Sequence, residues 1–126
     1  MRHQVSGFKL GRTSGQRKGL RRTMLSQLFT HESIRTTRTK ALFIRGEAER
    51  LITLARNSEN LSEIEKVNKR RLAAARLGNN PEIVKKLFDE IGPRFVNRKG
   101  GYTRMFNLGP RLGDAAEMVI LELVEE

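Results

Sequence analysis

The sequence contains no cysteine and no tryptophan, and each absence excludes a class of structure or function. Without cysteine there is no disulfide framework and no thiolate ligand for a metal, which is typical of a cytosolic protein. With one tyrosine and six phenylalanines, aromatic rings are too few for a reader of single strands built on stacked rings. No apolar run is long enough to cross a membrane, and no apolar segment follows the basic N-terminus. We therefore expect a cytoplasmic protein.

Acidic residues are also scarce, and the chain is strongly basic. Its 126 residues include 25 Lys and Arg against 14 Asp and Glu, a net charge of +11. The stretch from Ile91 to Gly113 contains five basic residues and no acid. This excess predicts a polyanionic partner such as nucleic acid, with an anionic membrane surface as the weaker alternative. The length allows one domain with a modest core.

The residues do not suggest catalysis. His3 and His31 lie far apart in sequence, and His31, at an expected helix end, is more typical of a structural residue than of a general base. The acids of residues 59–65 share a helix with lysines, as on a solvated face. Gly100-Gly101 is not followed by the Lys-Ser/Thr and helix of a P-loop. We predict a protein that is not an enzyme, with no cofactor, no metal and no small-molecule substrate.

Hydrophobic periodicity predicts an α+β fold with two layers. Apolar residues recur at helical spacing between capping and stop signals in four segments: 14–30, 38–56, 62–77 and 80–91. Residues 33–37 are β-branched and predict a short strand. Two apolar runs, 102–108 and 115–124, flank turn residues and predict a C-terminal hairpin. A lone hairpin is marginally stable, so the four helices should pack on a small mixed sheet, in a single domain over 14–126.

Several details of this fold can be tested. Ser14 is the expected cap of the first helix, and Gly92-Pro93 is the expected end of the last one. The most buried side chains should be Leu51, Leu87, Phe88, Val119 and Leu121. In the third helix, Lys69-Arg70-Arg71 interrupts an apolar pattern made of Ile64, Val67, Leu72 and Ala75. Glu47, Glu49 and Arg50 should be ordinary charges on the solvent face of the second helix.

Basic residues gather in three acid-poor stretches: 2–22, 35–40 and 94–111. The first includes an arm, residues 1–13, that we expect to be extended and to become ordered on a polyanion, the alternative being a solvated tail. Tyr102 either stacks on a base or lies at the sheet edge. The candidate RNA-binding residues are Arg2, His3, Lys9, Arg12, Arg17, Lys18, Arg21, Arg22, Arg35, Thr36, Thr37, Arg38, Lys40, Arg94, Arg98, Lys99, Gly100, Gly101, Tyr102, Arg104 and Arg111.

A series of short motifs, spread in order over nearly the whole chain, carries a family resemblance. They are Met1-Arg2-His3, Lys9-Leu10-x-Arg12, Ser14-x-x-Arg17-Lys18, Ile34-x-Thr36-Thr37, Lys40-Ala41, Asn68-x-Arg70-Arg71-Leu72, Lys86-Leu87-Phe88-x-Glu90-Ile91-x-Pro93-Arg94, Gly100-Gly101-Tyr102-Thr103-Arg104, Gly113-Asp114 and Glu122-Leu123-Val124. Each motif is weak alone, but together they are specific. With them the chain resembles the bacterial large-subunit ribosomal protein seventeen family.

The resemblance implies helices covering a small mixed sheet, and a structural role in the large ribosomal subunit. It implies binding to large-subunit ribosomal RNA near the peptide exit tunnel, in support of translation, with neighbouring ribosomal proteins, among them ribosomal protein thirty-two, as contacts. Carried over to this sequence, the RNA-facing positions are the N-terminal arm, the Arg17/Lys18 turn, the Thr36 to Lys40 junction and the loop from Arg98 to Arg104.

Two other functions compete with this interpretation. A free-standing nucleic-acid regulator could use residues 61–91 as a helix-turn-helix, but that region is balanced in charge where a recognition helix needs cations. An RNA-acting enzyme would need a catalytic constellation, which the sequence does not offer.

Overall fold

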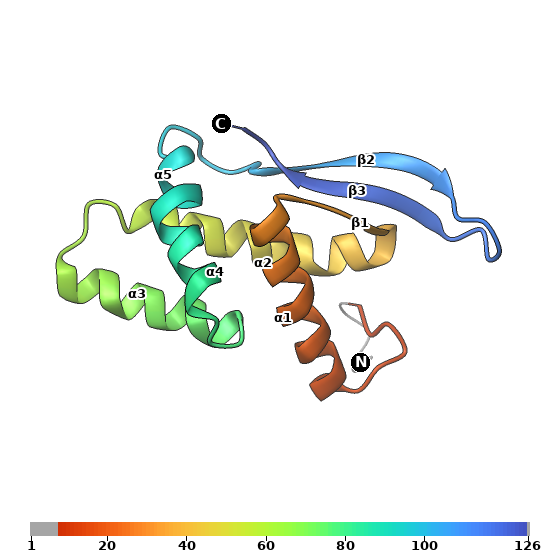
Figure 1. Ribbon diagram of the computed structural model, residues 1–126, viewed down its shortest axis with the longest axis horizontal. Coiled ribbons are helices and arrows are strands. Elements are labelled where there is room, and N and C mark those ends of the chain that lie inside the picture. Colours follow the sequence, from red (N-terminus) through yellow and green to blue (C-terminus); the bar gives the residue numbers. More distant parts are fainter. Residues whose placement is uncertain (1–7, 126) are drawn as a thin grey trace, which may run out of the picture.

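The computed structural model describes residues 8–125, in which helices lie on one side of a three-stranded sheet (Figure 1). The elements in chain order are α1 (Ser14–His31), β1 (Ser33–Thr37), α2 (Arg38–Asn57), α3 (Glu63–Arg76), α4 (Pro81–Lys86), a π-helical turn (Leu87–Ile91), α5 (Gly92–Arg94), β2 (Thr103–Pro110) and β3 (Glu117–Leu123). The predicted α+β fold is confirmed, and α2 runs directly beneath the sheet.

The sheet is antiparallel throughout, so the expectation of a mixed sheet is wrong. The strand order is β1-β3-β2, and β3 pairs antiparallel with both neighbours. Because β3 lies between them, β1 and β2 run in the same direction without forming a parallel pair. The side chains of Val119, Leu121 and Leu123 alternate along β3 and are buried, which is the face that the helices cover. The other face of the sheet is open.

The helix starts follow local hydrogen-bonding signals. Thr13, and not the expected Ser14, caps α1: its hydroxyl accepts a hydrogen bond from the Gln16 amide while the Gln16 side chain accepts one from the Thr13 amide. Thr37 ends β1 and also caps α2, so strand and helix meet without a linker. Ser62 caps α3 as the sequence predicts.

Helix α4 does not stop at Gly92-Pro93, contrary to the sequence-based expectation. The chain passes through the π-helical turn, in which the Gly92 amide donates to the Leu87 carbonyl, and continues helically to Arg94. Proline has no amide hydrogen, and it fits the first turn after this widened segment without breaking a hydrogen bond. The helical path therefore extends to the loop that leads into β2.

The predicted core is confirmed, but the apolar pattern of α3 does not form its buried face. Leu51, Leu87, Phe88, Val119 and Leu121 are at most 4% exposed. In α3, by contrast, Ala73 and the following Leu77 are buried, whereas the larger residues of the apolar pattern face solvent: Ile64 is 77% exposed, Val67 45% and Leu72 57%. Ala75 is exposed as well. Only the C-terminal half of α3 is packed, through one small side chain, so the larger apolar residues remain outside.

Residues 8–13, the part of the expected N-terminal arm that the structure describes, form a turn against α1. The Arg12 amide donates to the Lys9 carbonyl at 3.1 Å, and the Arg17 side chain donates to the Arg12 carbonyl at 2.6 Å. Candidate residues Arg2 and His3 lie outside the described residues. The division into an arm and a domain remains a prediction.

Candidate nucleic-acid interface

Four predicted cations on the first turns of α1 line one pocket. Arg17, Lys18, Arg21 and Arg22 surround a hollow of about 260 Å³ together with Ser14 and Arg76. We call these four cations with Arg76 the α1 cluster. Arg76 ends α3 and was not among the predicted residues, since only the fold brings it beside α1. The lining contains no acidic side chain, so the pocket is a site of concentrated positive potential.

Hydrogen bonds within the protein hold the α1 cluster in place but leave donors for a ligand. Arg22 donates from Nη2 to the Ala75 carbonyl at 3.3 Å, whereas its Nε is buried without a hydrogen-bond partner among the described residues. Arg76 lies 3.6 Å from the Glu47 carboxylate. Lys18 has no ion-pair partner in the range 8–125. A buried donor without an acceptor is costly, and a buried water at this position would remove that cost, so the donors that remain for a ligand are the outward-facing ones, Lys18 among them.

The second basic stretch adjoins the α1 cluster at the start of α2. The Arg21 guanidinium lies 4.9 Å from the centroid of the Phe43 ring, which joins the early turns of the two helices. The first turns of both α1 and α2 contain no acid. Lys40 therefore lies where its charge opposes the helix dipole, an arrangement that becomes favourable when an anion lies near the same free amides. Arg35 is exposed on β1, and Thr36 precedes the capping Thr37.

The third basic stretch is acid-free in sequence, but the fold supplies acids to it. Arg94 pairs with Glu32, the residue that ends α1. Arg104 pairs with Glu122 across the hairpin, and Arg111 pairs with Asp114 in the turn. Arg38 of the second stretch similarly lies 3.9 Å from Glu117. These four candidate cations are thus partly neutralised within the protein.

Two of these ion pairs lower the pKa values of the acids that take part in them. The hydrogen bond from Arg94, with smaller contributions from its charge and from Lys86, lowers the pKa of Glu32 below its usual value, while partial burial works against this. The Arg111 side chain, aided by the Ala116 amide, lowers the pKa of the exposed Asp114 to about 2. Both carboxylates remain charged at neutral pH and hold their arginines.

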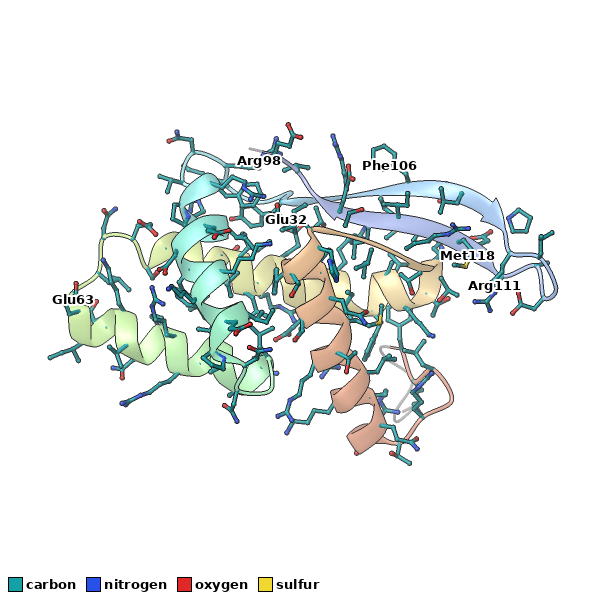
Figure 2. The ribbon with its side chains drawn as sticks, viewed as in Figure 1. Glu32, Glu63, Arg98, Phe106, Arg111 and Met118 are labelled. Carbon is teal, nitrogen blue, oxygen red and sulfur yellow. The ribbon has the colours of Figure 1, made fainter. Side chains whose placement is uncertain are left out.

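The loop that precedes β2 presents Arg98 and Lys99 to solvent. Gly100 and Gly101 have φ of 109° and 61°, a left-handed conformation that favours glycine, and Arg98 donates to the Gly101 carbonyl at 3.2 Å. Figure 2 shows Arg98 at one end of the hairpin and Arg111 at the other. The third stretch is therefore divided between two ends of the sheet.

A carboxylate on α2 anchors this loop. Glu49 accepts hydrogen bonds from the amides of Tyr102 and Thr103, at 3.0 and 3.3 Å, and from the Thr103 hydroxyl at 2.9 Å. The expectation that Glu49 is an ordinary solvent-face charge is wrong, and Glu47, which pairs with Arg50 and Arg76, is not one either. Helical spacing could suggest the pair of Glu47 with Arg50, which lie three residues apart on α2, but not the partners Arg76, Tyr102 and Thr103, which come from other elements.

Tyr102 belongs to the core. It is 2% exposed, its ring centroid lies 5.1 Å from that of Phe95, and its hydroxyl accepts a hydrogen bond from Thr53 at 3.2 Å. The sequence left open whether Tyr102 stacks on a base or has a structural place at the sheet edge. The structure supports the structural place, since a base cannot stack on a buried ring without unpacking it.

The fold and this surface define a small basic α+β protein whose described residues offer cations to a polyanion. Within residues 8–125, no group of three or more His, Cys, Asp or Glu could hold a metal ion, and no helix is long and apolar enough to cross a bilayer.

Comparison with known proteins identifies the family. A family model described as "Ribosomal protein L17" matches residues 20–124, so the chain belongs to the ribosomal protein L17 family. It is 45% identical over 126 residues to the large ribosomal subunit protein bL17 of Pelobacter propionicus, covering all of this chain and 93% of that protein. It is equally similar to the protein of that name from Trichlorobacter lovleyi, of which it covers 95%. Membership of a family of ribosomal proteins confirms the expectation of a protein that is not an enzyme.

Proposed function

We propose that this protein is a structural constituent of the large ribosomal subunit and binds ribosomal RNA through the α1 cluster, the junction between β1 and α2, and the loop at residues 98–101. Support comes from the family, from relatives named as large-subunit proteins that match over all of this chain, and from the charge of +11. The family resemblance further favours a place near the peptide exit tunnel with ribosomal protein thirty-two as a neighbour.

The single observation that carries RNA binding is the α1 cluster. Five basic side chains from two helices converge on one pocket, and no acidic side chain lines it in the described part of the chain. Guanidinium groups match the geometry of phosphate oxygens, and Lys18 adds a point charge. Contacts of this kind bind the sugar-phosphate backbone and orient the protein, largely independently of base identity.

The test removes charge from the α1 cluster and keeps a polar side chain at each position. The variant Lys18→Gln/Arg21→Gln should bind large-subunit ribosomal RNA more weakly, and its log K should depend less steeply on log salt, by up to about two units. The matched control Lys66→Gln/Lys69→Gln removes two charges from α3, outside the three basic stretches. An equal change in both variants would show that only net charge matters and would contradict the assignment of the site.

The place in the ribosome is tested separately. The protein should remain with purified large subunits through a high-salt wash, as a constituent does and a loosely bound regulator does not. Release into the supernatant at a salt concentration that leaves the neighbouring proteins bound would contradict the proposal.

A further inference from the structure

A groove between α3 and α4 lies apart from the α1 cluster and has a different chemistry. It has a volume of about 420 Å³, and its apolar lining comes from Val67 and Ala74 on α3 and from Pro81 and Val84 on α4. Val67 is 45% exposed, and Ile64, one turn earlier on the same helix face, is 77% exposed. An apolar stripe thus continues from the groove along the outside of α3 (Figure 2, where Glu63 marks the start of that helix).

The rim of this groove is basic and only partly neutralised. Arg70 pairs with Asp89 at 2.7 Å. Arg71 and Lys85, which also line the groove, have no ion-pair or hydrogen-bond partner within the described range. They come from the two helices that form the walls, so a ligand in the groove meets an apolar floor between two unpaired cations.

We propose that this groove docks a segment of another protein whose apolar side chains are flanked by carboxylates. The apolar side chains would cover Val67 and Val84, and the carboxylates would pair with Arg71 and Lys85. This is a protein-docking surface, separate from the RNA-binding surface proposed above, and it can be tested without reference to that function.

Two other occupants fit the groove less well. A ribose-phosphate chain would be attracted by the rim and could hydrogen-bond to Asn79, but its other polar groups would lose their hydration against the apolar side chains of the floor. A second copy of this chain, packed symmetrically on the same surface, would bring Arg71 and Lys85 against their own equivalents and be repelled.

The first test measures peptide binding by fluorescence anisotropy. The probe is a 14-residue amphipathic peptide with leucines at helical spacing flanked by glutamates, and its partner probe has lysine in place of each glutamate. The wild-type protein should bind the glutamate peptide. The variant Arg71→Glu/Lys85→Glu should bind it about tenfold more weakly and bind the lysine peptide more tightly than wild type does.

The controls separate this groove from the general basic charge. The variant Lys18→Glu/Arg21→Glu reverses two charges in the α1 cluster and should leave peptide affinity nearly unchanged, whereas Val67→Ser should weaken it without changing charge. If the α1 variant weakens peptide binding as much as the groove variant, or if Val67→Ser has no effect, the peptide binds by charge alone and the proposal is wrong.

The second test identifies the occupant in assembled particles. A photoreactive amino acid at position 67, in large subunits that contain the protein, should cross-link to a protein segment with acidic and apolar residues. Cross-links to RNA, to a second copy of this chain, or to nothing would each overturn the inference. Loss of the protein from the subunits would instead contradict the proposed ribosomal role, while the peptide measurements would still decide on the groove.

Discussion

At the scale of single residues, the fold divides the candidate cations into paired and unpaired ones. Residues from Ile91 to Gly113 include no acid, yet Glu32, Glu122 and Asp114 reach Arg94, Arg104 and Arg111. Glu32, the partner of Arg94, lies at the end of the first helix, too far away in sequence for the pair to be predicted. Lys18, Arg35, Lys40 and Lys99 have no ion-pair partner in the part of the chain that is described. Sequence reasoning could find the basic residues but not their partners.

Glu32 should make stability depend on pH. Its folded-state pKa lies below the usual 4.5, so its contribution is complete above about that pH and is lost as pH falls through the lowered value. Glu32→Gln should lower the free energy of unfolding by about 1 kcal/mol at pH 7, a modest loss because the ion pair is partly exposed. In urea melts, the difference in free energy of unfolding between wild type and variant should become smaller below pH 4.5.

Glu59→Gln is the matched control for this prediction. Glu59 makes no ion pair within residues 8–125, so its substitution should leave stability nearly unchanged at both pH values. If the difference in free energy of unfolding between wild type and Glu32→Gln stays constant from pH 7 to pH 3, the ion pair of Glu32 contributes nothing to stability.

At the scale of elements, periodicity predicted which segments are helices and strands, and the errors lie where packing decides. Thr13 and Ser14 are both good caps, and the sequence alone does not choose between them. Pro93 is a strong stop signal, but the π-helical turn ahead of it lets the helix continue. The interrupted apolar pattern of α3 did not show which face is buried, because the helix packs through Ala73 and leaves Ile64, Val67 and Leu72 outside.

Gly92 should be needed for the close packing of α5 against α2. Its backbone is helical, but a Cβ there would lie 3.0 Å from the carbonyl carbon and the Cβ of Ala55. Gly92→Ala should destabilise the protein by about 1–3 kcal/mol, because overpacking outweighs the gain of roughly 1 kcal/mol from removing a helical glycine. Urea melts measure the difference.

The control for this prediction is a second helical glycine with space around it. A Cβ on Gly46 in α2 would meet nothing within 4 Å, so Gly46→Ala should stabilise by about 0.5–1 kcal/mol. The two substitutions should therefore have opposite signs. If Gly92→Ala also stabilises, α5 and α2 do not approach as closely as described.

At the scale of the whole molecule, charge is distributed in a way that the sequence predicted only in part. One face would be uniformly positive if the fold brought all three basic stretches together. The fold does bring the first two together, through the contact of Arg21 with Phe43. The third is spread along the hairpin, with Arg98 at one end and Arg111 at the other (Figure 2). Position in the sheet therefore decides which of these cations can act together.

The last prediction concerns the loop of Arg98 and Lys99. This loop lies at the other end of the hairpin from the turn that contains Arg111. Both residues are exposed in a loop that Glu49 anchors through residues beyond them, so Arg98→Ala/Lys99→Ala should leave the fold intact. If both side chains neutralise phosphates, affinity for ribosomal RNA should fall, and the slope of log K against log salt should decrease by up to roughly two units.

Combining this variant with Lys18→Gln/Arg21→Gln tests whether the two surfaces act independently. Sites that share no partners should have additive effects on binding free energy. Binding across a salt series gives both quantities for each variant and for the combination. Unchanged slope and affinity in Arg98→Ala/Lys99→Ala would mean that the charge of the loop does not contribute to RNA binding. RNA binding would then rest on the α1 cluster and the start of α2, where cations from separate elements already converge on one pocket.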